Sequence, residues 1–357
     1  MDDREAMRRA IDLAWGGWGR VGRNPLVGAL VLRDGAVVGE GFHAEFGGRH
    51  GEVAALEAAG SRARGADLVV SLEPCAHYGK TPPCTDAIVA AGIRRVVFGA
   101  HDVDPKARGG AGVLQGRGVR VVPGVLEQEV QAQNALFFHR FAQTARPFVA
   151  LKLAVSLDAR IADRTGRSQW VSGSEAREYA HWLRAGFDAI GVGAGTASAD
   201  DPALTVRGRV MPARPPLRVV FDRRGEVPVA ATVVRTARET PTLVLLGREV
   251  PEPTRAALEA AGALVADADG PGDAAAELAR RGVGSVLIEG GGVVAGRWLK
   301  EDLVDRIYLI SAPILLGGDG VPAFAGIGGV SIASVRRWRT VDRRTLGNDS
   351  LLVLDRP

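Results

Sequence analysis

The only two cysteines of this 357-residue chain lie close together, downstream of a histidine and a glutamate. The residues are His50-Gly51-Glu52, Pro74-Cys75 and, after eight intervening residues, Cys84. One imidazole and two thiols make a three-ligand set for Zn²⁺, and a catalytic zinc site leaves its fourth position to water. The fold must therefore bring these three side chains to one point, with Glu52 left free to move protons.

Two other uses of the thiols fit the cysteine count. A disulfide between Cys75 and Cys84 would need an oxidising compartment, and no signal peptide suggests one. Two buried, unreactive thiols are the second alternative. Neither explains the His-x-Glu pair upstream, whereas zinc nucleobase deaminases use a histidine, two cysteines and a glutamate that is the general acid and base.

Apolar runs and capping residues predict the structure around these ligands. Residues 27–32 and 68–72 are typical of short buried strands, and residues 52–59 favour a helix. Thr85-Asp86 begins a second helix, which ends at Gly92. We therefore expect His50 and Cys84 at two helix N-termini that face each other across a sheet, where the helix dipole favours a thiolate.

Length and patterning predict two domains. A deaminase would be complete by about residue 145, and 357 residues correspond to roughly two domains. A helical stretch at 126–141 closes the first domain, and a linker follows at 141–147. Strands and helices then alternate, which predicts an α/β domain with a substantially parallel sheet. The expected strands are 148–154, 188–193, 217–222, 242–246, 284–289 and 304–311, and the expected helices 174–186, 253–261 and 293–300.

Composition and charge are ordinary for a globular protein, with 46% hydrophobic and 24% charged residues. Residues 2–15 are typical of an amphipathic helix, and no apolar run approaches the ~20 residues that cross a bilayer, so we expect a cytoplasmic protein without a membrane partner. The net charge is +4, but the arginines are spread among acids without a dense basic tract. We therefore expect no nucleic-acid partner, since a phosphorylated substrate and cofactor explain the excess equally well.

Two glycine-rich runs in the second half are candidate cofactor sites. They are Gly191-Val192-Gly193-Ala194-Gly195-Thr196 and Glu289-Gly290-Gly291-Gly292. Glycines between a strand and a helix let a phosphate approach the backbone at the helix N-terminus. Neither run has the Gly-x-Gly-x-x-Gly spacing of a dinucleotide fingerprint, so tight strand-to-helix turns remain the alternative.

The segment from Pro74 to Cys84 resembles one family of deaminases. Its form Pro-Cys-x-x-x-Gly-x-Thr-Pro-Pro-Cys, with Asn24-Pro25-x-Val27-Gly28 and Gly41-x-His43 upstream, is similar to the riboflavin-biosynthesis deaminases that act on a pyrimidine ribosyl phosphate. The resemblance implies that Asn24, His43 and Lys80 line the pyrimidine pocket. A turn, a packing histidine and a solvated lysine are the alternatives. Gly51 departs from the alanine most frequent in that family.

The second half resembles the reductase domain that follows this deaminase in bifunctional bacterial proteins. The resemblance lies in Leu151-Lys152-Leu153-Ala154-x-Ser156-Leu157-Asp158, in Thr196-x-x-x-Asp200-Asp201-Pro202-x-Leu204-Thr205-x-Arg207 and in Glu289-Gly290-Gly291. It covers nearly the whole chain and implies a cytidine-deaminase-like α/β/α domain at 1–145 and a dihydrofolate-reductase-like α/β domain at 146–357 that uses NADPH. Ala159-Arg160 stands where the family commonly has Gly-Lys.

The resemblance also implies roles for single residues of the reductase. NADPH would contact Ala154, Trp170, Thr196, Asp200, Gly290, Gly291, Gly292 and Arg297, and the substrate would contact Ser168, Arg184, Leu204, Arg207 and Glu289. Arginine suits a ribose phosphate because its guanidinium binds as a charge-assisted fork. Lys152 and Asp200 are candidates to assist ring opening or protonation, with a structural ion pair as the alternative. Trp170 would lie beside the nicotinamide or belong to the core.

The expected activity has two steps on one phosphorylated pyrimidine. The first is zinc-dependent hydrolytic deamination of a diaminopyrimidinone ribosyl phosphate, with Glu52 as the proton shuttle. The second is reduction of the ribosyl group to a ribityl group by NADPH. One alternative is a deaminase of nucleosides or tRNA with an unrelated C-terminal domain, and another is a non-catalytic zinc-stabilised module. The resemblance further implies a homo-oligomer.

Overall fold

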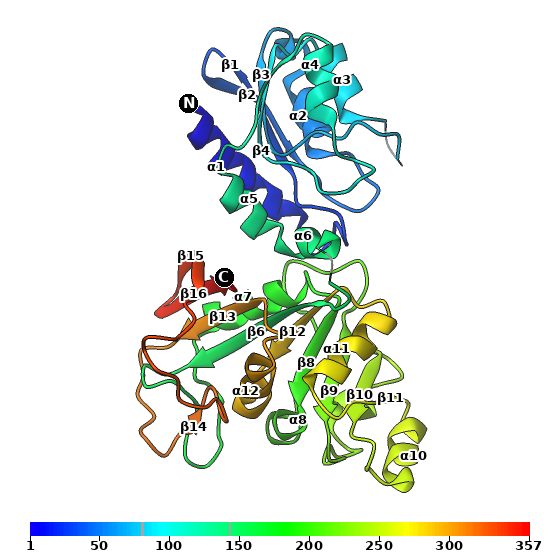
Figure 1. Ribbon diagram of the computed structural model, residues 1–357, viewed down its shortest axis with the longest axis vertical. Helices are drawn as coiled ribbons and strands as arrows, with labels where there is room; N and C mark the ends of the chain where they lie inside the picture. Colours follow the sequence, from blue (N-terminus) through cyan, green and yellow to red (C-terminus); the bar gives the residue numbers. More distant parts are fainter. Residues whose placement is uncertain (80–81, 143) are drawn as a thin grey trace. The chain divides into compact units, whose positions relative to one another are not determined.

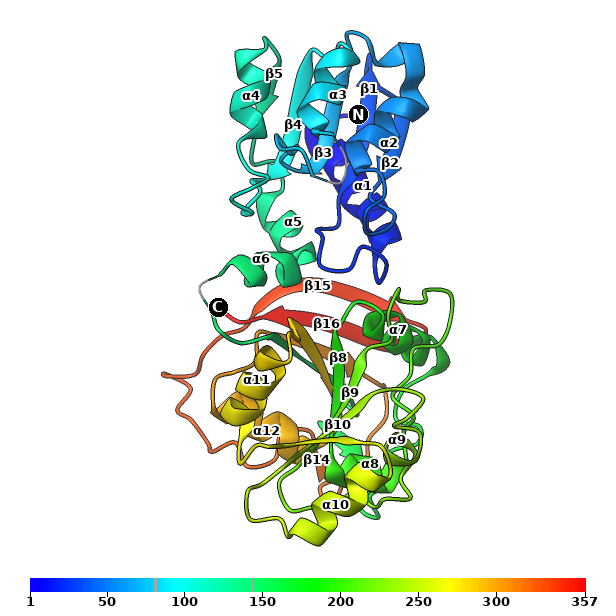
Figure 2. The same cartoon turned by 90° about the vertical axis from the view of Figure 1, so that its right-hand side faces the viewer.

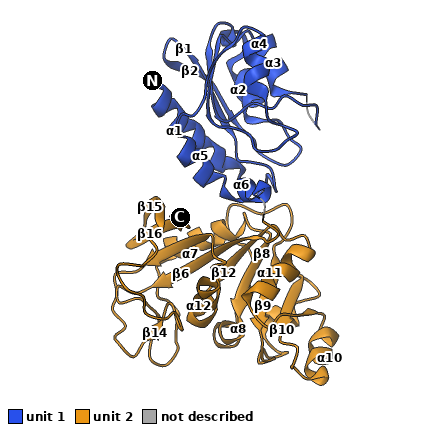
Figure 3. Ribbon diagram, viewed as in Figure 1, with its two compact units in different colours: residues 1–143 blue, residues 144–357 orange. Residues whose placement is uncertain are grey.

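The computed structural model describes residues 1–79, 82–142 and 144–357. The chain forms two compact units, residues 1–143 and residues 144–357 (Figure 3). Each unit has hydrophobic cores of its own. Within the described ranges, no helix combines the length and the apolar character that crossing a membrane requires.

The first unit is built on a five-stranded sheet in the order β2-β1-β3-β4-β5. β1 is antiparallel to both of its neighbours, whereas β3, β4 and β5 are parallel. The β1–β2 hairpin turns at Asp34-Gly35, where both residues have positive φ, as two-residue hairpin loops favour. The strands are β1 (Gly28–Arg33), β2 (Ala36–Phe42), β3 (Asp67–Leu72), β4 (Arg95–Ala100) and β5 (Arg120–Val122).

Helices cover both faces of this sheet (Figure 1). A capping box of Asp2 and Glu5 starts α1, which packs so closely on β1 that a Cβ at Gly28 would lie 2.0 Å from the Ala10 carbonyl oxygen. α2 packs on β1 and β2 and contacts α3, so the two helices lie side by side. The helices are α1 (Asp3–Ala14), α2 (Gly51–Ala59), α3 (Cys84–Ala90), α4 (Gly110–Gly116), α5 (Glu127–Gln133) and α6 (Ala135–Phe141).

The second unit is built on a nine-stranded sheet in the order β11-β10-β9-β8-β12-β6-β13-β16-β15. The pairs from β11 to β13 are parallel, and β16 and β15 add an antiparallel edge (Figure 2). The strands are β6 (Phe148–Val155), β8 (Ala189–Gly193), β9 (Leu217–Asp222), β10 (Thr242–Leu246), β11 (Leu264–Asp267), β12 (Ser285–Glu289), β13 (Arg306–Ser311), β15 (Arg339–Leu346) and β16 (Asp349–Asp355). β7 (Arg160–Ala162) and β14 (Val321–Pro322) form a separate pair.

Successive residues of the central strands belong to different cores, because side chains alternate between the two faces of a sheet. Val219 of β9 packs in one core with residues of α11 and α12, and Val220 packs in the other with residues of α8 and α9. Helices therefore lie on both faces of the parallel part. They are α7 (Ser174–Arg184), α8 (Ala194–Asp200), α9 (Thr232–Arg235), α10 (Glu252–Ala260), α11 (Pro271–Arg280) and α12 (Gly292–Lys300).

The predicted α/β architecture of both halves is confirmed, with two local corrections. The single helix expected at 126–141 is two helices, because the buried Asn134 side chain bonds to both backbone groups of Leu26, at 2.7 and 3.0 Å. The helices that begin near His50 and Cys84 do not face each other across the sheet but lie side by side.

Candidate active sites

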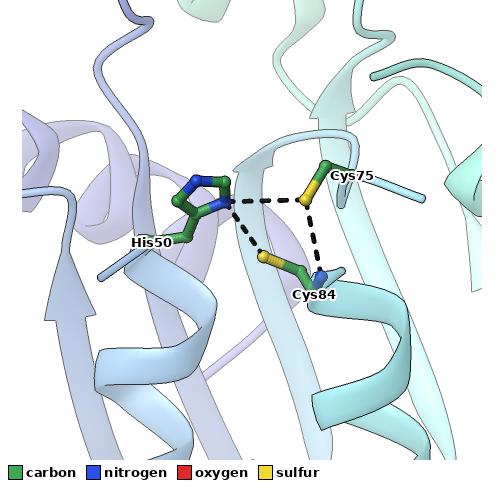
Figure 4. A group of neighbouring side chains, drawn as sticks. All are labelled: His50, Cys75 and Cys84. Carbon is green, nitrogen blue, oxygen red and sulfur yellow. Dashed lines mark hydrogen bonds between the residues drawn. The ribbon is translucent and has the colours of Figure 1, made fainter. Parts of the chain in front are cut away.

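Three predicted metal ligands converge in the first unit (Figure 4). His50 is the N-cap of α2, Cys84 is the first residue of α3, and Cys75 follows β3. His50 Nδ1 lies 3.2 Å from Cys84 Sγ and 3.6 Å from Cys75 Sγ. One ligand atom from each residue lies within 4.8 Å of the others, and both cysteines are free thiols rather than a disulfide. This donor set of one nitrogen and two sulfurs fits Zn²⁺ with one position left open.

A buried carboxylate, that of Glu73, holds the chain just before Cys75. Glu73 accepts hydrogen bonds from the backbone N–H groups of Asp102, Gly109 and Ala111 at 3.0–3.2 Å. At Gly110, an added Cβ would lie 1.8 Å from the Pro74 carbonyl oxygen. The loop that carries Cys75 is therefore fixed by protein contacts as well as by its thiol.

Glu52 lies in the first turn of α2 and is 3% exposed. Burial raises the pKa of its carboxyl group to about 7. Its Oε2 atom is buried and has no hydrogen-bond partner. A carboxyl group with a pKa near neutrality both takes up and gives back a proton readily. Hydrogen bonding from Cys84 meanwhile holds the pKa of the Cys75 thiol well below its usual range, which favours a thiolate ligand.

A cavity of about 240 Å³ lies beside these residues and is lined by His50, Glu52 and Cys75. Asn24 and His43 also line it, with Asn24 Nδ2 at 3.2 Å from His43 Nε2. The other ring nitrogen of His43 lies 2.9 Å from the Arg49 carbonyl oxygen, and burial lowers the His43 pKa. Both ring nitrogens of neutral His43 are thus engaged, so His43 orients Asn24, whose second amide hydrogen and oxygen remain for a ring. Lys80, the third expected pocket residue, lies outside the described residues.

Sequence reasoning missed four charged residues that line the same cavity, Glu73, Asp102, Asp104 and Arg140. Asp102 follows β4, and burial raises the pKa of its carboxyl group to about 6. Arg140 lies in the last turn of α6. Asp102 is two residues beyond the end of β4, which pairs in parallel with β3, the strand that leads to Cys75. That position after a strand is the sequence signal that could have identified Asp102. Arg140 has no such signal, because only the tertiary structure brings it to the cavity.

The second unit contains a cavity of about 760 Å³ at the carboxyl ends of β8, β9 and β12. Ligands of open α/β sheets bind at this edge. Every residue expected at the reductase site lines the cavity: Lys152, Ala154, Ser168, Trp170, Arg184, Thr196, Asp200, Leu204, Arg207, Glu289, Gly290, Gly291, Gly292 and Arg297. The structure therefore gathers residues that span almost 150 positions of the sequence.

A buried charge cluster forms one wall of this cavity. Arg184 donates from Nε and Nη2 to both oxygens of Glu289, at 2.5 and 3.0 Å, and Lys152 Nζ lies 3.6 Å from Glu289 Oε2. Burial acts to raise the pKa of Glu289, but the charges of Arg184 and Lys152 lower it to about 2. Arg184 also donates to the Thr205 carbonyl oxygen, so its fork is already occupied, whereas Arg207 is exposed.

The structure decides two of the open alternatives in this unit. Trp170 is 68% exposed, with the Arg177 guanidinium 4.7 Å from its ring centroid, so it is not a core residue. Asp200 forms no ion pair within the described ranges and instead accepts a hydrogen bond from Ser168 Oγ at 2.8 Å. Lys152 does pair with an acid, yet it also faces the cavity.

Both glycine-rich runs are strand-to-helix turns that line the cavity. One joins β8 to α8, and the other joins β12 to α12. Gly290 and Gly291 have positive φ, and a Cβ at Gly292 would lie 2.1 Å from the Pro322 carbonyl oxygen. The missing side chain of Gly292 thus makes room for Pro322, whereas Gly290 and Gly291 leave the backbone at the start of α12 open to a phosphate-bearing cofactor. The turn therefore fits NADPH.

The loop between Asp200 and Arg207 is held by hydrogen bonds to Thr232 and Arg218. Asp201 accepts hydrogen bonds from the N–H and hydroxyl groups of Thr232, at 2.6 and 2.7 Å, at the start of α9. Beyond the end of α9, the buried Arg218 donates to Thr236 and also to the Ala203 carbonyl oxygen at 3.2 Å. α9 thus fixes the backbone next to Leu204, a buried residue with φ +50°.

Family models match both halves of the chain. Residues 1–100 match the cytidine and deoxycytidylate deaminase zinc-binding region, and residues 147–352 match the RibD C-terminal domain. The riboflavin biosynthesis protein RibD of Bacillus amyloliquefaciens is 39% identical over 353 residues, which cover 96% of this chain and 93% of that protein.

Solved structures agree over nearly the full length. A deaminase/reductase from Thermotoga maritima has a TM-score of 0.80 and 35% identity. RibD from Acinetobacter baumannii has a TM-score of 0.79 and 34% identity. In both comparisons the match covers 99% of this chain and 99% of the other.

Proposed function

This chain belongs to the RibD family, and we propose that its two cavities are the two active sites of one riboflavin-biosynthesis enzyme. The protein is a bifunctional enzyme with a zinc-binding deaminase domain and an NADPH-dependent reductase domain. We assign the deaminase to residues 1–145 and the reductase to residues 146–357. The observation that carries the assignment is the His50–Cys75–Cys84 cluster beside the unpartnered carboxylate oxygen of Glu52.

In the deaminase cavity, the chain orients the ring and moves protons. Zinc, when bound by His50, Cys75 and Cys84, supplies a Lewis acid that makes water nucleophilic at neutral pH. Glu52 takes a proton from the water and returns it to the departing amine, which leaves as ammonia. The remaining hydroxyl proton moves to the adjacent ring nitrogen, so that a ring carbonyl is formed. Asn24 holds the edge of the pyrimidine through hydrogen bonds of its side-chain amide, and His43 orients that amide.

In the reductase cavity, NADPH supplies the hydride that converts the ribosyl group to a ribityl group. The glycine turn at 290–292 and Thr196 receive the cofactor, as do Ala154, Trp170, Asp200 and Arg297. Lys152 donates a proton as the sugar ring opens. Because its fork is occupied, Arg184 acts by holding Glu289 toward the substrate, and the exposed Arg207 binds the phosphate with help from Ser168 and the backbone at Leu204.

The alternative of a nucleoside or tRNA deaminase with an unrelated C-terminal domain is not favoured, because residues 147–352 match a reductase family. The absence of a nucleic-acid partner is supported by the lack of a dense basic tract. A cytoplasmic location and a homo-oligomer are further proposals; light scattering of the purified protein tests the second.

One reaction mixture tests both activities. The purified protein, zinc, NADPH and the diaminopyrimidinone ribosyl phosphate are followed for ammonia release and NADPH loss. We expect both, with ammonia formed first. Ammonia without NADPH oxidation would contradict the reductase assignment, and turnover of cytidine or tRNA but not of this pyrimidine would contradict both.

A further inference from the structure

Acidic side chains predominate among the charged residues that line the deaminase cavity, and their charge disfavours a phosphorylated ligand. Its walls carry the carboxyl groups of Glu52, Glu73, Asp102 and Asp104. Among the lining residues that the structure describes, the permanently charged cation is Arg140. A phosphate dianion that enters this cavity is repelled by the acids, so its binding depends on a positive partner placed within reach.

Arg140 lines the cavity from helix α6, whose start is anchored by side-chain hydrogen bonds. It stands three residues after Phe137, which also lines the cavity, and residues three apart share one face of a helix. Helix α6 starts directly after Asn134, whose side chain is bonded to the backbone of Leu26. Leu26 lies between two lining residues, Pro25 and Val27. The helix with Arg140 is thus tied to a segment that forms another part of the lining.

The guanidinium of Arg140 also forms no ion pair with a carboxylate among the described residues. It contacts the Phe141 ring, at 5.2 Å from the centroid. Other arginines of this unit are taken up by acids: Arg95 pairs with Asp3 and Asp67, and Arg117 pairs with Asp86. A stabilising interaction with the C-terminal dipole of α6 is the competing explanation for an arginine here, but it does not require the side chain to line a cavity.

We propose that Arg140 anchors the substrate of the deaminase by binding the 5′-phosphate of its ribosyl group. The inference rests on the proposed function and adds a phosphate subsite to that cavity. A guanidinium fork binds two phosphate oxygens at once, which leaves the pyrimidine free to reach Glu52 and the His50–Cys75–Cys84 cluster. Arg140 therefore selects the phosphorylated substrate over the corresponding riboside, and it does so without taking part in the chemistry.

The test compares two substrates in four proteins: wild type, Arg140→Met, Arg140→Lys and Arg8→Met. Arg8 is an exposed residue of α1 that does not line the cavity, so its variant removes the same charge elsewhere. The kcat/KM for ammonia release is measured with the phosphorylated substrate and with its dephosphorylated riboside. We expect Arg140→Met to lower kcat/KM about 10- to 100-fold for the phosphorylated substrate, mainly through KM. Turnover of the riboside, and NADPH oxidation with the deaminated phosphorylated product, should be unchanged.

Each other outcome overturns the proposal. An equal loss with both substrates would make Arg140 a structural residue of α6, and no loss would place the phosphate on another group, including the undescribed segment at 80–81. If Arg140→Lys and Arg8→Met both lowered kcat/KM for the phosphorylated substrate as much as Arg140→Met, the loss would be a general charge effect. A wild type that releases no ammonia from either substrate would refute the proposed function itself, and that result is distinct from the other three.

Discussion

The buried cluster of Glu289, Arg184 and Lys152 makes a quantitative prediction about stability. In the Glu289→Gln variant the two cations keep their places and lose the charge that balances them. A carboxyl pKa lowered from 4.5 to about 2 corresponds to about 3 kcal/mol of stability for the folded state. Truncating one member of a buried ion pair typically costs about 3–5 kcal/mol, which is the same range.

The dependence on pH follows from the direction of this shift. Because the folded-state pKa is depressed, the stabilisation is fully present above pH 4.5 and is lost as the pH falls through about 2. The difference between wild type and Glu289→Gln should therefore narrow from about 3 kcal/mol at pH 7 to about 2 kcal/mol near pH 3.5. For a domain of this size, 3 kcal/mol lowers the Tm by roughly 6–12 °C.

Scanning calorimetry of the full chain measures this effect, with the transition of the second unit identified by its shift on adding NADPH. Glu178→Gln, on the exposed face of α7, is the matched control and should leave the Tm unchanged. A loss below 1 kcal/mol at pH 7, or a loss that is the same at pH 7 and pH 3.5, would show that the charges of Arg184 and Lys152 are not what holds Glu289 ionised.

Three shorter predictions concern the two active sites. Glu52→Gln should slow ammonia release by about 10²- to 10⁴-fold and leave NADPH oxidation with the deaminated substrate intact; a parallel loss of both would indicate misfolding. Removing zinc with a chelator should stop ammonia release with little change in far-UV circular dichroism, because Glu73 fixes the ligand loop; unfolding on chelation would contradict this. Gly292→Ala should raise the KM for NADPH and destabilise the second unit by about 1–3 kcal/mol, since its Cβ would meet the Pro322 carbonyl oxygen; an unaltered KM would show that the turn tolerates a side chain.

The local sequence was enough to predict those strands and helices whose position depends on their own residues. The strand at 217–222, the strand at 242–246 and the helix starts at His50 and Cys84 follow from apolar runs and caps, and the structure has them there. The β1–β2 hairpin was missed, although Asp34-Gly35 between apolar runs is a strong hairpin signal. The break at Asn134 had no such signal, because it depends on Leu26, 108 residues earlier in the sequence.

The same distinction applies to the sites. The metal cluster was predictable because each ligand lies within a short motif. Asp102 was signalled only by its position after β4, and Arg140 reaches the cavity through the packing of α6, so no spacing rule identifies Arg140. The bidentate pairing of Arg184 with Glu289 also joins positions 105 residues apart, which is why sequence reasoning assigned Arg184 as well as Arg207 to the phosphate.

The closely packed glycines have a consequence for genetics. At Gly28, Gly110 and Gly296, an added methyl group would lie between 1.8 and 2.0 Å from a backbone carbonyl oxygen, a contact that only a shift of the main chain relieves. A mutational scan should therefore rank these three positions with the metal ligands among the least tolerant of the chain, although none has a reactive group. Loss-of-function alleles of this enzyme are expected at residues that never touch a substrate, and intolerance to substitution alone would misplace its active sites.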